Sequence, residues 1–156
     1  AMGKGLSNKL KIIFGNIKPV ERPFICNQVI ESPLWLIGFV DGEGCFYIKA
    51  LNNKKVSVKF SISQHSRDKE LFKIIKNYLN CGIIEEVSTR PNIVNFVVYR
   101  LDDILLKIIP LFKSNNLLSN KNINFNNFTK VAFLMQKKEH LTKEGLEKII
   151  EIKNKR

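Results

Sequence analysis

The chain has 156 residues, and its 26 Lys and Arg against 14 Asp and Glu give a formal charge of +12. This basic excess favours a nucleic-acid partner, with a merely lysine-rich, solubilising surface as the alternative. With 44% hydrophobic and 10% aromatic residues, the chain is too apolar for a disordered basic tail and long enough for one domain with an arm. Three cysteines without a CxxC pair argue against disulfide-rich and zinc-finger proteins and predict a reducing intracellular compartment. No apolar run approaches the roughly 20 residues of a membrane span, so no membrane contact is expected.

Residues 1–32 are predicted to form an N-terminal arm or linker. Leu6, Leu10 and Ile13 recur at helical spacing, and the glycine and prolines that follow interrupt the pattern. A short helix followed by an extended stretch is therefore expected. The remainder, residues 33–156, is predicted to form a single domain.

The predicted domain opens with an unusually apolar helix. Ser32-Pro33 is typical of a helix start, because the serine hydroxyl can cap free N–H groups and proline at the first position loses no hydrogen bond. The segment Leu34–Val40 is apolar almost all round, with Gly38 and Gly42 four residues apart. Such a helix must be buried, and small residues at this spacing allow a second helix to approach closely.

After this helix the hydrophobic period changes to two, which is typical of strands. In residues 45–51 and 56–63 apolar side chains alternate with polar or aromatic ones, and Asn52-Asn53 predicts a turn between them. No acid occurs from Cys45 to Gln64, whereas a solvated sheet face normally mixes both signs. A face of one sign favours a phosphate-bearing partner over simple solvation.

The second half of the domain repeats the order of one helix and two strands. Ser66 can cap a helix over residues 67–80, and strands are expected at 83–88 and 93–100. Further helices are expected at residues 103–112, 125–138 and 142–153. This order predicts an α+β fold, a four-stranded antiparallel sheet forming a saddle with helices on one face and a polar, basic face left open.

The segment that points most directly to chemistry is the end of the first domain helix, which carries two acids and two glycines. Asp41 and Glu43 lie near the helix C-terminus, where the helix dipole disfavours an anion unless a cation compensates. A carboxylate beside a backbone carbonyl in a basic protein is typical of a Mg²⁺ site. Either acid could instead cap a neighbouring helix, and the residues alone leave both interpretations open.

Residues 36–44, Leu-Ile-Gly-Phe-Val-Asp-Gly-Glu-Gly, resemble the LAGLIDADG motif of homing endonucleases position by position. The resemblance extends over residues 33–153 and to the αββαββα order of the family. Gly5–Pro23 and Lys138–Leu146 look like the linker and tail of the second half of two-motif fungal mitochondrial enzymes. One copy of the motif is present, whereas the family needs two that pack as a pair.

The resemblance implies a site-specific double-strand DNA endonuclease that uses Mg²⁺ or another divalent cation. It implies that Glu43 is the catalytic, metal-binding carboxylate and that the Gly42 carbonyl assists it. Gln64, at the end of the second strand, would order water in the active site. Lys121, in the loop after Phe112, would lie near the scissile phosphate.

The resemblance also implies two surfaces. The open sheet face would lie in the major groove of double-stranded DNA, with contacts from Tyr47, Lys49, Lys55, Ser57, Lys59, Ser61, Ser63, Asn95, Val97 and Tyr99. The face that pairs two motif helices would comprise Trp35, Gly38, Phe39 and Gly42. The partner helix would come from a second copy in a homodimer or from a second LAGLIDADG domain. A mitochondrial location is implied, and the alternative function is an RNA-splicing maturase acting on intron RNA, or a non-cleaving DNA-binding protein.

Overall fold

The computed structural model describes residues 8–15, 29–50, 55–86 and 88–155. Its elements in chain order are α1 (Asn8–Ile13), α2 (Pro33–Glu43), β1 (Gly44–Ala50), β2 (Val56–His65), the 3-10 turn η1 (Ser66–Asp68), α3 (Lys69–Leu79), β3 (Ile83–Glu86), β4 (Ile93–Val98), α4 (Leu101–Asp103), the π-helical turn η2 (Ile104–Ile108), α5 (Ile109–Ser114), α6 (Lys121–Gln136), the 3-10 turn η3 (Glu139–Leu141) and α7 (Lys143–Asn154). The helical piece expected in the arm is α1. The expected extended linker falls largely on residues 16–28, and the turn Asn52-Asn53 on residues 51–54, both outside the described residues.

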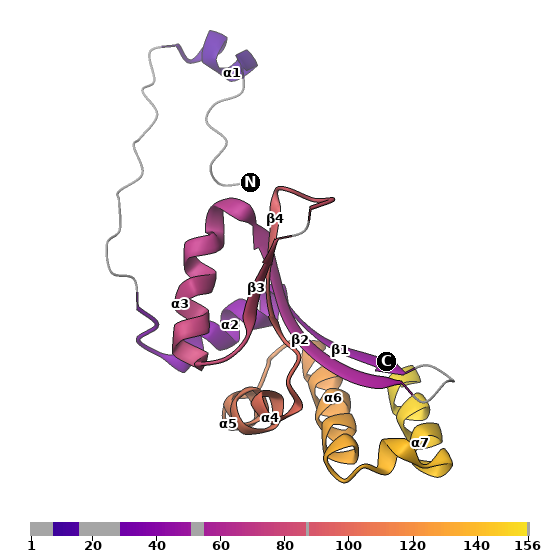
Figure 1. Cartoon of the computed structure of the whole chain (residues 1–156). Helices are drawn as coiled ribbons and strands as arrows, with labels where there is room; N and C mark the ends of the chain where they lie inside the picture. The colour runs from indigo at the N-terminus through magenta and orange to yellow at the C-terminus, as the bar shows by residue number, and fades with distance from the viewer. Residues whose placement is uncertain (1–7, 16–28, 51–54, 87, 156) are drawn as a thin grey trace.

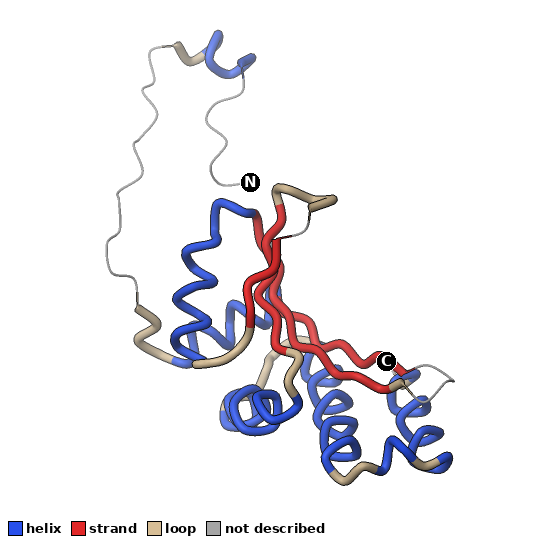
Figure 2. The backbone as a smooth tube through the Cα atoms, viewed as in Figure 1, coloured by secondary structure: helices blue, strands red, loops and turns tan. Residues whose placement is uncertain are grey.

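The four strands form one antiparallel sheet in the order β1-β2-β4-β3. The sheet curves along its length, and α2, α3, α5, α6 and α7 all lie on one side of it (Figures 1 and 2). The opposite face carries no helix among the described residues. The predicted α+β fold, with a four-stranded antiparallel sheet and helices on one face, is confirmed.

Alternating apolar residues of the strands build the core against these helices. Phe46 of β1 packs with its ring centroid 5.3 Å from Phe60 of β2, 5.5 Å from Phe112 of α5 and 5.4 Å from Phe128 of α6. Burying each such side chain contributes roughly 1.5–3 kcal/mol. A register slip of one residue would move Phe60 to the open face, so this core fixes which side chains the open face presents.

Two predicted helix starts differ from the structure. Ser66 does not cap the helix, because His65 Nδ1 accepts from the Arg67 N–H at 3.3 Å and α3 begins only at Lys69, after a 3-10 turn. Helix α6 begins at Lys121, earlier than expected, so this lysine lies on a helix and not in a loop.

Among the described residues, no helix combines the length and the apolarity that crossing a bilayer requires.

Candidate active site

Helix α2 begins and ends as its sequence predicts. Ser32 Oγ accepts from the Leu34 N–H at 3.2 Å, with Pro33 at the first helical position. At the other end, the Gly44 N–H donates to the Val40 carbonyl and the chain passes directly into β1. A Cβ on Gly44 would collide with the Val40 side chain, so only glycine fits this junction. The junction places Glu43 at the end of the sheet.

Lys121 supplies the cation expected at the end of α2. Its Nζ donates to the Gly42 carbonyl at 2.5 Å and to the Val40 carbonyl at 3.2 Å. The last carbonyls of a helix lack intrahelical donors, and its C-terminal end favours a positive charge. As the first residue of α6, Lys121 would be disfavoured by the dipole of its own helix, and the end of α2 offsets this. The Gly42 carbonyl, expected as a metal ligand, is thus already an acceptor for an ammonium group.

Asp41 binds the residue before the N-cap of α6 and so does not itself cap that helix. Its carboxylate accepts hydrogen bonds from the backbone N–H, at 3.2 Å, and the hydroxyl of Ser119, in the turn that leads into α6. The Ser119 hydroxyl in turn accepts from the Lys121 N–H at 3.2 Å. These bonds, chiefly the one from the Ser119 hydroxyl, lower the pKa of Asp41 below its ordinary 3.8. Asp41 therefore ties α2 to α6 and helps to place Lys121.

Replacing Asp41 with asparagine is expected to lower the melting temperature at neutral pH. A carboxyl group whose pKa is lowered on folding stabilises the fold above its unfolded pKa, and this stabilisation is lost as the pH falls through the folded value. The difference in melting temperature between wild type and Asp41→Asn should therefore shrink below pH 3.8, the ordinary aspartate value. Thermal denaturation at several pH values checks this, with the exposed Asp102→Asn as control. A difference that does not change with pH would count against the carboxylate's role.

Glu43 and Gln64 lie at the same end of the sheet. Glu43 is exposed and, within the described residues, makes no side-chain hydrogen bond or ion pair. The β1–β2 pairing ends where Gly44 faces Ile62, so Gln64 lies two residues beyond that pair, half-buried on β2. Lys121 reaches the carbonyl of the residue before Glu43. The structure thus brings the three predicted catalytic residues to one end of α2 and the sheet.

The donor set at this site suits a shared divalent cation better than one enclosed by this chain. The described residues contain no cluster of three or more His, Cys, Asp or Glu side chains that could hold an ion. Mg²⁺ commonly binds one or two carboxylates and completes its coordination with water and substrate phosphates. The exposed Glu43 carboxylate could serve as one of these ligands.

The predicted DNA-contacting residues divide by exposure. Tyr47, Lys49, Lys55, Ser57, Ser63 and Tyr99 are exposed, and Lys59 and Asn95 are half-buried. The Lys59 ammonium lies 4.6 Å from the Tyr47 ring centroid and 6.0 Å from that of Tyr99. Cation–π contacts of this kind hold a lysine in place while leaving its donors free.

Ser61 and Val97 are on the expected face, but the expectation that they are open to a partner is wrong. Only 6% of Ser61 and 1% of Val97 is exposed. The two residues face each other in the middle of the sheet. The Tyr99 side chain reaches across this row to Glu85, and the Tyr47 side chain interacts with Ser61. The flanking tyrosines therefore cover the positions where the alternation alone predicts exposure.

The face of α2 that is predicted to pair with a second motif helix is exposed within the described part of the chain. Leu36, Ile37 and Val40 are buried, but Trp35 is 47% exposed and stacks on Phe39 at 5.3 Å. A Cβ added to Gly38 or Gly42 would meet none of the described residues within 4 Å. Within the described residues one side of this helix therefore faces the core and the other is exposed, so the predicted burial of the second side would need a partner helix.

Glu85 is a surface residue that the sequence patterns above did not single out. It faces Asn95 across the β3–β4 pair and accepts a hydrogen bond from the Tyr99 hydroxyl at 2.9 Å. Strand alternation could have indicated its position. Ile84 packs against the core, and successive side chains of a strand point to opposite faces, so Glu85 must lie on the open face.

Comparison with known proteins assigns the family. Residues 36–132 match the family model described as LAGLIDADG endonuclease, and the chain belongs to this family. It is 39% identical over 160 residues to probable intron-encoded endonuclease 2 of Neurospora crassa, an alignment covering 96% of this chain and 35% of that protein.

Two solved structures are similar along almost the whole chain. One is the LAGLIDADG homing endonuclease I-GzeII in complex with its DNA target, with a TM-score of 0.89, 38% identity, and coverage of 100% of this chain and 54% of that one. The other is I-SmaMI bound to an uncleaved DNA target in the presence of calcium ions, with a TM-score of 0.87, 37% identity, and coverage of 98% and 54%. The chain spans about a third to a half of the length of these relatives.

Proposed function

We propose that this chain is a DNA-binding and catalytic half of a site-specific double-strand DNA endonuclease. The observation that carries the proposal is the end of α2, next to a basic sheet. There the Glu43 carboxylate, which has no partner among the described residues, follows a carbonyl that accepts from the Lys121 ammonium. The DNA-bound structures of similar proteins support a duplex partner. The second half would be another copy of this chain or another LAGLIDADG domain.

In this proposal Glu43 and its counterpart from the second half would hold a divalent cation, Mg²⁺ or another. When bound, such an ion activates a water molecule and neutralises charge on the phosphate. Lys121 has three ammonium donors, and two of them are used on the Val40 and Gly42 carbonyls. The third is available to stabilise charge that develops on the scissile phosphate. Gln64 would orient the attacking water through its amide.

The open sheet face would lie in the DNA major groove. Strands β1 and β2 carry lysines but no acid, and a curved antiparallel sheet presents alternate side chains toward base edges and phosphates. Lys49 and Lys55, both exposed, are placed to contact phosphate. Ser57, which faces Lys49, and Ser63, at the end of the sheet near the candidate active site, are also exposed.

The cellular setting is proposed from the same relationships. The name of the N. crassa relative supports an intron-encoded origin, and the resemblance to fungal mitochondrial enzymes supports a mitochondrial location. A maturase acting on intron RNA, or a non-cleaving DNA-binding protein, would not need the catalytic acid. The presence of Glu43 therefore favours the nuclease.

Replacing Lys55 or Lys59 with alanine is expected to weaken DNA binding. For each phosphate interaction that the substitution removes, the slope of log affinity against log salt should fall by about one. Replacing the exposed Ser57 should instead change which base pairs the protein prefers. Titrations of labelled duplex at several salt concentrations measure both effects, with Lys148→Ala on α7 as a charge-matched control. If the sheet variants behave like Lys148→Ala, the sheet is not the DNA surface.

A further inference from the structure

The open face of the sheet contains an acidic residue where the partner is proposed to be a polyanion. Glu85 lies on the edge strand β3, half-buried, opposite Asn95 of β4. Its neighbour Ile84 packs against the core, so Glu85 shares the open face with Tyr47, Lys59 and Tyr99. Facing DNA, a carboxylate is repelled by phosphate and needs a donor to compensate it.

The environment of Glu85 holds the carboxylate in place without neutralising it. The Tyr99 hydroxyl donates to Glu85 Oε1 at 2.9 Å, and partial burial together with this bond raises the pKa of Tyr99. Beside it, Ser63 Oγ donates to Asn95 Oδ1 at 2.6 Å. Within the described residues Glu85 makes no ion pair, so most of its acceptor capacity remains unused.

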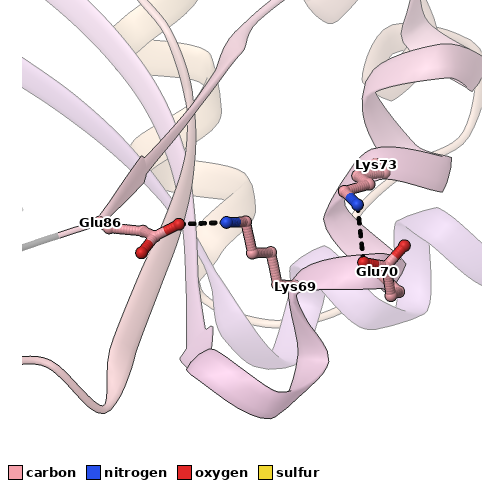
Figure 3. A network of polar contacts seen from close by, with 4 residues as sticks. All are labelled: Lys69, Glu70, Lys73 and Glu86. Carbon is pink, nitrogen blue, oxygen red and sulfur yellow. Dashed lines mark hydrogen bonds and ion pairs between the residues drawn. The ribbon is translucent and has the colours of Figure 1, made fainter.

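The next residue in the strand shows the opposite arrangement. Glu86 forms an ion pair with Lys69 at the start of α3, and Lys73 pairs with Glu70 on the same helix (Figure 3). The carboxylate that points toward the helices thus has a cationic partner, and the one on the open face has none within the described residues. This contrast indicates that the Glu85 carboxylate can accept a further hydrogen bond from a donor group outside the chain.

The major groove offers such a donor in the exocyclic amino groups of cytosine and adenine. Cytosine presents its N4 amino group as the only polar group at its groove edge, whereas adenine places the N7 acceptor beside its N6 amino group. A carboxylate, which only accepts, would be repelled by that N7. Cytosine is therefore the better match.

We propose that Glu85, positioned by the Tyr99 hydroxyl, accepts a hydrogen bond from cytosine N4 and determines specificity at one base pair of the target. This inference rests on the proposed DNA-binding function. Glu85 would contact the base, and Tyr99 would act through Glu85 as a positioning residue.

The test is selection of bound sequences from a randomised duplex pool by the full 156-residue chain. Wild type should enrich cytosine at a position where Glu85→Gln lowers the preference about fivefold or more, as expected when a charged group that only accepts is replaced by an amide that also donates and can pair with adenine. Total affinity for the pool should not fall in Glu85→Gln, because removing a negative charge reduces phosphate repulsion. Glu86→Gln, one residue away on the other side of the strand, should keep the wild-type preference.

Tyr99→Phe separates positioning from packing, since it keeps the ring beside Lys59 and removes only the hydroxyl. It should weaken the preference at the same base pair while leaving the salt dependence unchanged. If Glu85→Gln and Tyr99→Phe both bind with the wild-type cytosine preference, the Glu85 assignment is overturned and the proposed DNA function stands. If the wild-type chain selects no sequence at all, the proposed function and this inference both fail.

Discussion

Glu43→Gln is expected to abolish DNA cleavage while DNA affinity stays within about tenfold of wild type. Glutamine keeps the size and shape of the side chain but loses the negative charge that holds a divalent cation. The fold should be unaffected, because Glu43 is exposed and makes no side-chain hydrogen bond or ion pair within the described residues. Cleavage of a bound duplex in Mg²⁺ and equilibrium binding in its absence measure the two effects separately.

The matched control for this change is Glu31→Gln, an exposed acid before the opposite end of α2, which should cleave normally. Full activity of Glu43→Gln would remove its catalytic assignment. Binding that drops as much as cleavage would make Glu43 a structural residue or a DNA contact.

Gly38→Leu is expected to weaken the pairing of two motif helices and to lower cleavage by about a hundredfold, since small displacements of a catalytic group have effects of that size. Among the described residues a Cβ at Gly38 meets nothing within 4 Å, and Gly38 is exposed, so we expect a larger side chain there to leave the core intact. Between two paired α2 helices, a leucine at this position would push the helix axes apart, because the side chains at the contact set the distance between the axes. The exposed Trp35 and its stacked neighbour Phe39 border the same surface.

Solution mass and cleavage rate should fall together in Gly38→Leu. Gln136→Leu adds the same side chain at an exposed position at the end of α6 and should change neither. A chain that remains monomeric at micromolar concentration and still cuts both strands would rule out pairing through α2.

The fold was largely predictable because its signals are local. Ser32-Pro33 marks the start of α2, and the alternation from Val56 to Ile62 places one face of β2 in the core. The errors arose where side chains from distant segments meet. Ser61 and Val97 follow the alternation, yet the side chains of Tyr47 and Tyr99 reach across strands and cover them, and no single-strand pattern reports that.

The candidate site could be predicted only in part, because local patterns indicate some of its residues whereas tertiary contacts position the others. The motif itself indicates Glu43, and the helix dipole argument predicts a compensating cation near it. That this cation is Lys121, bound to the Gly42 and Val40 carbonyls, depends on how α6 packs against α2. The link through Asp41 and Ser119, 78 residues apart in sequence, is a tertiary contact that residue patterns do not reveal.

The most direct test of the account is cleavage of a supercoiled plasmid, carrying a duplex selected by the wild-type chain, by wild type, by Glu43→Gln and by their equimolar mixture in Mg²⁺. Paired α2 helices with one Glu43 for each strand predict linear DNA from wild type, intact plasmid from Glu43→Gln, and additional nicked circles from the mixture, since mixed pairs cut one strand. Linear product from Glu43→Gln alone, or a mixture that yields linear DNA without added nicked circles, would contradict the account.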